Sequence, residues 1–231
     1  MALACGLTYL LSLGDARTLR AVGVWVKPMK FMSATALFAW TTVWVAELAN
    51  PALTHRQAYS DIATGLVITS LFEVVYITYQ ASQGRASHYN TSDAGHAFMF
   101  GLMGLAAVAL TATQAWLAWE LWQAQGDQPL SVTSCSVITG LSLTFVLSTI
   151  SGFMLGGHQP PAGSGWPIVG WHLEKDIRPA HFLGVHAQQL IPLWGLIAER
   201  FLPLQATQAL TLGSALYVLL WMLLTWRGLG L

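Results

Sequence analysis

The chain has 231 residues, of which 55% are hydrophobic and only 9% are charged. A soluble domain carries about 25% charged residues, so most of this surface does not face water. Basic and acidic residues balance to a net charge of zero, which argues against a nucleic-acid partner. The cysteines, Cys5 and Cys135, form no C-x-x-C motif, which excludes a disulfide framework, a thiolate zinc site and an iron–sulfur cluster. The composition predicts an integral membrane protein.

Seven apolar stretches follow one another along the chain. A helix needs about 20 apolar residues to cross the ~30 Å hydrocarbon core of a bilayer. Six stretches reach that length within boundary error, whereas the first would reach only ~20 Å at 1.5 Å per residue. The sequence predicts an all-α bundle of seven transmembrane helices, or six if the first is not a full span. The predicted helices are 1–13, 28–48, 62–81, 96–122, 132–155, 180–198 and 204–226.

Lysine and arginine are divided unequally between the two sides of the predicted bundle. If the helices alternate in direction, one side holds most of the basic residues and the other holds only Arg56 and Arg200. Cytoplasmic loops carry the excess of basic residues, so the N-terminus is predicted outside and the C-terminus inside a bacterial cytoplasmic membrane. The basic residues of the predicted cytoplasmic side are Arg17, Arg20, Lys27, Lys30, Arg85, Lys175, Arg178 and Arg227.

The longest connection is segment 156–179, which is rich in glycine and proline. A loop of that length in a compact domain is usually functional or disordered. We expect its Trp166 and Trp171 to fold back onto the membrane as a lid. The sequence shows no internal repeat, and residues 1–231 are predicted to form a single domain.

The histidines concentrate on the predicted cytoplasmic side, at the ends of several helices. Neutral imidazoles from different helices, together with a carboxylate, suit zinc or non-haem iron, whereas a hydrogen-bonded polar network is the alternative. His96 and His172 are expected to be bystanders, because helix 96–122 offers no polar companions and the long loop is exposed. The predicted metal ligands are His88, His158, His181 and His186.

Glu73 is an ionisable residue inside helix 62–81, about 12 Å from its cytoplasmic end. A carboxylate at this depth normally faces the bundle interior and marks a functional site, although a protonated or paired structural residue is the alternative. Gln80 lies seven residues further on, on nearly the same helical face. Glu73 and Asp176 are the predicted catalytic carboxylates, with Glu73 as a metal ligand or general base acting on metal-bound water or oxygen.

Lys27 and Lys30 begin helix 28–48, where their charges oppose the helix dipole. They either anchor the helix by snorkelling or clamp an anionic group of a lipid-like substrate. Gly184, between His181 and His186, leaves room for a neighbouring helix or a flat cofactor. The predicted substrate-binding residues are Lys27, Lys30, Gln80, Arg85, Ser87, Asn90 and Arg178.

At these positions the chain resembles a bacterial family of uncharacterised polytopic membrane proteins. The shared pattern includes Lys27-Pro28-x-Lys30-Phe31, Ser87-His88-Tyr89-Asn90 and Asp176-Ile177-Arg178-x-Ala180-His181-Phe182-x-Gly184-x-His186. This resemblance supports the site but implies no chemistry. A looser likeness is to the seven-helix membrane hydrolases that include alkaline ceramidases and the adiponectin receptors. It would assign site roles to Ser87, His88, Asp93, His181 and His186.

Three functions remain open from the sequence. The first is a membrane-embedded metal-dependent hydrolase or oxidoreductase that acts on a lipid-like or amphiphilic substrate. The second is a b-type haem protein of membrane electron transfer, with His186 and either His88 or His158 as axial ligands. The third is a proton-coupled transporter with Glu73 as its carrier site, or a nonenzymatic subunit of a complex.

Overall fold

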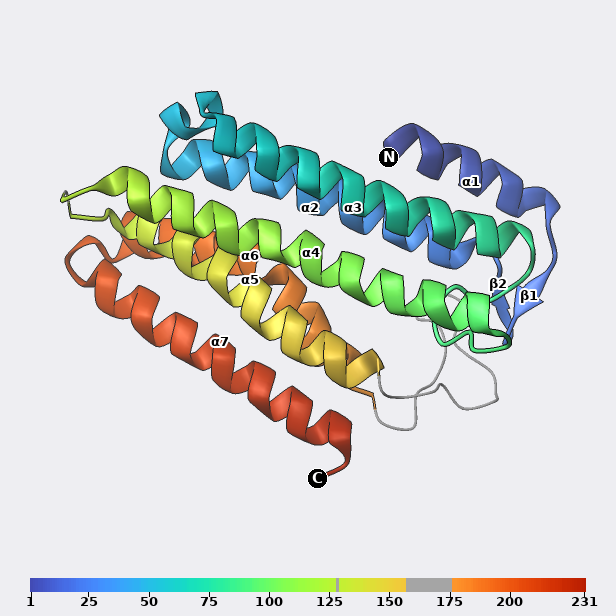
Figure 1. Cartoon of the computed structure of the whole chain (residues 1–231). Helices are drawn as coiled ribbons and strands as arrows, with labels where there is room; N and C mark the ends of the chain where they lie inside the picture. The colour runs from blue at the N-terminus through green and yellow to red at the C-terminus, as the bar shows by residue number, and fades with distance from the viewer. Residues whose placement is uncertain (128, 157–175) are drawn as a thin grey trace.

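The computed structural model describes residues 1–127, 129–156 and 176–231, and it is helical almost throughout (Figure 1). Each predicted apolar stretch corresponds to an α-helix whose ends lie within a few residues of the expected ones. The predicted all-α fold is therefore confirmed. The helices are α1 (Ala2–Gly14), α2 (Val26–Ala49), α3 (Gln57–Ser82), α4 (Ala94–Gln125), α5 (Val132–Gly156), α6 (Arg178–Phe201) and α7 (Ala206–Leu229).

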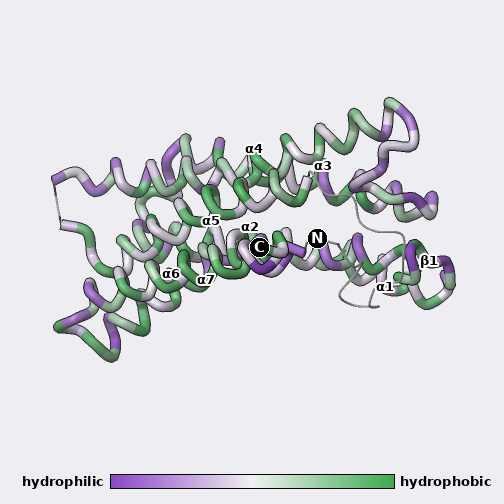
Figure 2. The backbone as a smooth tube through the Cα atoms, turned by 90° about the horizontal axis from the view of Figure 1, so that it is seen from below, coloured by the Kyte–Doolittle hydropathy of each residue, from purple (hydrophilic) through white to green (hydrophobic). Residues whose placement is uncertain are grey.

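Five of these segments are long and apolar enough to cross a membrane: α2, α3, α4, α5, and α7 with the short helix before it. Helix α1 has 13 residues, and Figure 1 shows it lying along one half of α2. Hydrophobic residues run along all the helices, whereas hydrophilic stretches concentrate in the connections at the two ends (Figure 2). The chain is a helical integral membrane protein.

The two ends of the bundle differ in their connections. At one end, strands β1 (Thr18–Leu19) and β2 (Val22–Gly23) form a small antiparallel hairpin between α1 and α2. Its two-residue turn, Arg20 and Ala21, has positive φ at both positions, as a type I′ turn requires. We call this end, which also holds the α3–α4 loop and the start of α6, the hairpin end. The opposite end holds the 3₁₀ helices η1 (Pro51–His55) and η2 (Pro203–Gln205), and we call it the η end.

An apolar cluster closes the η end of the bundle. Its side chains come from α2, η1, α3, α4 and α5, and they leave little or no surface exposed. Between membrane helices such a cluster stabilises mainly through close van der Waals packing, because lipid tails are as apolar as these side chains. We call this cluster the apolar plug; it comprises Val45, Ala46, Leu53, Ile62, Leu117, Ala118, Leu121, Val137 and Leu141.

Helices α5 and α6 approach each other closely because glycines lie between their backbones. A Cβ atom at Gly184 would lie 2.7 Å from the backbone nitrogen of Ser148, and one at Gly140 would lie 2.9 Å from the carbonyl oxygen of Ala187. Small residues permit such approach between membrane helices, where packing and interhelical hydrogen bonds drive association. Because the two helices are so close, the backbone N–H of Gln188 donates a hydrogen bond to the Thr144 hydroxyl, at 2.8 Å. The space at Gly184 is therefore used by a neighbouring helix.

Gly184→Ala is expected to destabilise the protein by about 1–3 kcal/mol, because the new methyl group meets the backbone of α5 and cannot be relieved by a rotamer change. Gly101→Ala is the matched control, since a Cβ at that position in α4 would meet nothing within 4 Å. The measurement is the thermal unfolding midpoint of each variant in the same detergent. Equal midpoints for the two variants would show that the α5–α6 contact is looser than described.

Candidate functional site

Helix α3 carries a stripe of buried polar side chains toward the hairpin end. Ser70, Glu73 and Gln80 are each exposed by 4% or less, and Tyr76 is also buried. Glu73 lies about 14 Å from the end of α3, at 1.5 Å per residue. Ser70 Oγ, Glu73 Oε1 and Gln80 Oε1 have no hydrogen bond of good geometry within the described parts of the chain, and the Tyr76 hydroxyl has only the Gln80 side chain close to it. We call these four residues the polar stripe.

Lys27 and His88 approach the polar stripe from two other elements. Lys27, in the first turn of α2, interacts electrostatically with both Glu73 and His88. Its ammonium group lies 5.7 Å from the ring centroid of Phe31, and that ring lies 5.7 Å from the ring of His88. Across the described residues the ion pairs are Asp15–Arg17, Asp93–His96 and Asp176–Arg178, so no direct ion pair joins Lys27 to Glu73.

His88 is held in the α3–α4 loop between Phe31 and Phe100. Its Nδ1 lies 3.2 Å from the hydroxyl oxygen of the buried Ser87. Burial, and then the charge of Lys27, lower the pKa of His88 well below its usual value. The imidazole is therefore neutral at pH 7, and in this form it can accept a proton or bind a metal ion.

The α3–α4 loop is fixed by contacts of the residues that follow His88. Tyr89 has a φ of 56°, a conformation that side chains rarely adopt, and its hydroxyl donates to the Leu155 carbonyl at 2.8 Å. Asn90 donates to the Ala86 carbonyl and accepts the N–H of Ser92, so its amide stabilises the loop itself. This bonding joins the loop to the end of α5 and leaves the Asn90 amide occupied.

The remaining predicted residues form a second group at the start of α6. Asp176 and Arg178 make a two-point ion pair, at 2.7 and 2.6 Å. Lys30 is exposed and is repelled by Arg178, which also interacts with Tyr89. Arg85 is exposed. The structure thus connects Lys27 with Glu73 and His88, and it connects Arg178 with Asp176, Lys30 and Tyr89.

The two histidines of α6 have different partners. His181 Nδ1 lies 3.0 Å from Ser151 Oγ in α5, whereas the His186 ring packs 4.1 Å from the Phe182 ring. His158 and His172, with Trp166 and Trp171, lie outside the described residues. Within the described residues no three His, Cys, Asp or Glu side chains come together to hold a metal ion. The four-histidine metal site and the haem site accordingly remain predictions.

A groove in the surface of the bundle adjoins the polar stripe. It lies between α3 and α4, has a volume of about 390 Å³, and has a predominantly apolar lining. Tyr76 lines this groove and also belongs to the polar stripe, so the stripe and the groove meet at this residue. The groove is lined by Leu71, Phe72, Val75, Tyr76, Tyr79 and Met99.

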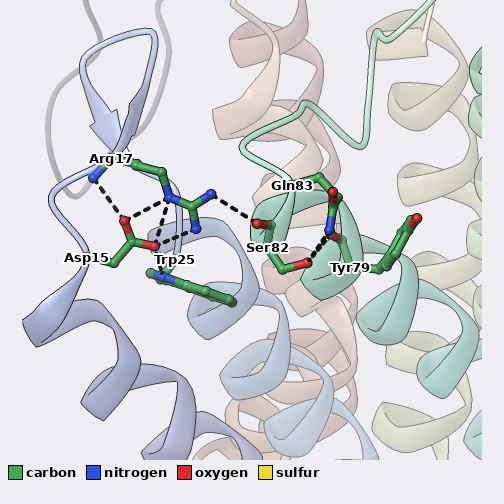
Figure 3. A network of polar contacts seen from close by, with 6 residues as sticks. All are labelled: Asp15, Arg17, Trp25, Tyr79, Ser82 and Gln83. Atoms are coloured by element: carbon green, nitrogen blue, oxygen red, sulfur yellow. Dashed lines mark hydrogen bonds and ion pairs between the residues drawn. The ribbon is translucent and has the colours of Figure 1, made fainter.

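A polar network joins the hairpin to the end of α3, as Figure 3 shows. Asp15 accepts hydrogen bonds from Arg17 and from the indole N–H of Trp25, the latter at 2.8 Å. Arg17 donates to the Ser82 carbonyl at 3.0 Å, which satisfies one of the free carbonyls at the helix terminus. The network fixes the start of α2, and so the position of Lys27, relative to α3.

Sequence reasoning assigned no role to a second set of buried polar residues near the centre of the bundle. Gln114 and Gln188 are fully buried, and Thr42 is 4% exposed. They come from three different helices, and Thr42 lies within 3.4 Å of both amide oxygens. Glutamines inside apolar helices were the available signal, because polar groups at membrane depth are costly.

Comparison with known proteins gives no match to a protein family, a curated protein or a solved structure. The resemblances inferred from the sequence motifs therefore stay predictions. The fold and the site define the class of the protein, a helical membrane protein with a buried carboxylate and neighbouring polar groups near one end.

We expect the Asp15 network to loosen in acid. Hydrogen bonds from Arg17 lower the pKa of Asp15 below its usual value. The ionised carboxylate therefore stabilises the folded state fully above about pH 4, and this stabilisation is lost as the pH falls through the lower pKa of the folded state. Fluorescence of the Trp25 indole, compared between the intact protein and Trp25→Phe, reports the change. Asp15→Asn should remove this pH dependence; an unchanged acid transition in that variant would contradict the assignment.

Proposed function

We propose that this protein binds the polar head of an amphiphilic, lipid-like ligand at the polar stripe and carries out acid–base chemistry on it. The hairpin end would face the cytoplasm, because Arg17, Arg20, Lys27, Arg85 and Arg227 lie toward that end. Helices α2 to α7 would all cross the membrane. Helix α6 is more polar than the others, but it packs between α5 and α7.

The observation that carries this proposal is the meeting of an apolar groove with unsatisfied polar atoms at Tyr76. A buried acceptor without a donor costs about 1–3 kcal/mol, so Glu73 Oε1 and Gln80 Oε1 favour a ligand that supplies hydrogen-bond donors. The apolar lining of the groove between α3 and α4 would suit an alkyl chain. A ligand with a hydroxyl-bearing head and an apolar chain satisfies both parts.

Glu73 and His88 are the proposed acid–base groups. A carboxyl group and a neutral imidazole near one ligand head can exchange protons with it, and such positioned groups accelerate reactions by about 10²–10⁴-fold. Lys27 interacts electrostatically with both Glu73 and His88. Its positive charge would stabilise a negative charge that develops on the ligand. Gln80 and Tyr76 would orient the head group.

The metal-dependent enzyme is the form of this proposal in which a zinc or iron ion activates water beside Glu73. Two observations support this form. The lowered pKa of His88 favours the neutral imidazole that a metal ion requires, and Lys27 interacts electrostatically with both His88 and Glu73. It requires further ligands from His158 and from α6. Stoichiometric zinc or iron in the purified protein, lost in His88→Ala, would support this form, and a metal-free active protein would exclude it.

We expect no haem spectrum from the purified protein. The described contacts of the two α6 histidines are with Ser151 and Phe182, and none of the described contacts joins His186 to His88, its expected partner in holding a haem. Absorption spectra before and after dithionite test this. A Soret band that shifts on reduction, with sharpened α and β bands, would contradict the expectation and favour the b-type haem alternative.

Labelling with a diazirine-bearing monoacylglycerol tests the ligand site in nanodiscs. The wild-type protein should be labelled saturably within the groove peptide that contains Val75 and Tyr79. Glu73→Leu should reduce the apparent affinity roughly tenfold or more, since hydrogen bonds to charged groups contribute about 1.5–3 kcal/mol. The matched control is Glu199→Leu, because Glu199 is an exposed carboxylate near the η end of α6.

Equal labelling of the wild type and Glu73→Leu would show that the probe occupies the groove as ordinary bilayer lipid. Labelling spread evenly over all helices would lead to the same conclusion. A thermal unfolding measurement on each variant separates loss of the ligand from loss of the fold.

A further inference from the structure

We propose that the centre of the bundle binds a monovalent cation through neutral oxygen atoms of Thr42, Gln114 and Gln188. We call these three residues the oxygen node. Helices α2, α4 and α6 each contribute one of them. This site is separate from the polar stripe and does not depend on the function proposed for it.

The oxygen node has fewer hydrogen-bond donors than acceptors. Thr42 Oγ1 lies 3.3 Å from Gln114 Oε1 and 3.4 Å from Gln188 Oε1. These separations exceed the 2.5–3.0 Å of ordinary O–H···O hydrogen bonds. The hydroxyl has a single hydrogen, and its nearest acceptor is the Phe38 carbonyl of its own helix, at 2.9 Å. Both amide oxygens therefore lie close to the Thr42 hydroxyl, and neither has a strong donor among the described residues.

The amide nitrogens do not remedy this shortage. Gln114 Nε2 donates to Thr113 Oγ1 at 3.0 Å, and Gln188 Nε2 has no partner among the described residues. Gln114 and Gln188 are both 0% exposed, so neither bulk water nor lipid head groups reach them. A positive ion between the oxygens would remove the repulsion of their partial charges.

Helix α6 offers two further acceptors in the same turn. Gln189 Oε1 has no hydrogen bond of good geometry among the described residues and lies near His186, while its Nε2 donates to Thr41 of α2 at 3.1 Å. Pro192 lies inside α6 and has no N–H, so the Gln188 carbonyl loses its usual intrahelical donor. Interrupted membrane helices supply such carbonyls to bound Na⁺ in transporters.

The chemistry of the oxygen node favours a monovalent ion over a divalent one. Its three residues are neutral amides and a hydroxyl, whereas Ca²⁺ and Mg²⁺ sites use carboxylates. The apolar plug begins one helical turn further toward the η end, with Val45 in α2 and Leu117 in α4. An ion would therefore reach the node from the hairpin end.

Thermal unfolding in sodium, potassium and choline chloride at equal ionic strength tests the cation site. A bound ion should raise the midpoint saturably with its concentration, because a ligand that binds only the folded state stabilises it by mass action. Choline, which is too large for the node, should give no such rise. Equilibrium binding of radioactive sodium should show about one site per chain.

Thr42→Val should weaken the ion affinity at least tenfold. Thr35→Val is the matched control, since Thr35 is also a buried threonine of α2 that donates to its own helix, at the Phe31 carbonyl. Gln188→Leu provides a second test at another oxygen.

Equal midpoints in all three salts, together with no saturable sodium binding, would overturn the proposal. The amides would then satisfy each other or hold a water molecule. An ion-dependent rise that is unchanged in Thr42→Val and Gln188→Leu would also overturn it, because the ion would bind elsewhere.

Discussion

The absence of water in the bilayer core is the constraint on which this structure depends. Every polar group between the helices must find its partner inside the protein. Most of the buried serines and threonines in the described residues do so by bonding to the carbonyl four residues before them, as Thr35, Thr41 and Ser151 do. Several of the buried polar atoms that have no partner among the described residues belong to the polar stripe, and one, Gln188 Nε2, belongs to the oxygen node.

These two places have different surroundings. The polar stripe is near Lys27, an apolar groove and the hairpin end, and these surroundings are the basis for proposing an amphiphilic ligand there. The oxygen node is enclosed by neutral side chains between three helices. The α5–α6 glycine contact contributes to this enclosure, since it brings Thr144 against the N–H of Gln188. The bundle thus contains two separate groups of buried polar side chains, one with ionisable members and one with neutral members.

The fold could be predicted largely from hydropathy, because a membrane span requires a long apolar run and little else. The number of helices, their order and their ends to within a few residues followed from that rule. The β1–β2 hairpin could not be predicted, because its turn uses Arg20 and Ala21 at positive φ instead of the usual Asn-Gly. The local cost of these conformations is not visible as a sequence signal.

The site was predictable only in part. Glu73, Gln80 and Lys27 were singled out because charges and amides at membrane depth are rare, and the structure brings them toward one another. The seven histidines were a weaker indication of a site. The face of a helix on which a histidine lies can be predicted from the sequence, but the rotation of the neighbouring helices, which decides what that histidine contacts, cannot. His181 and His186 consequently have separate partners, and the long loop with His158 is outside the described residues.

The apolar plug bears on what an ion in this bundle could do. A bare charge that moved from the oxygen node to the η end would meet the nine apolar side chains of the plug, which cannot replace its hydration. The Born energy of such a step amounts to tens of kcal/mol. In this conformation the apolar plug is a barrier to ions. An ion at the oxygen node would therefore stay bound there and would not pass through the protein.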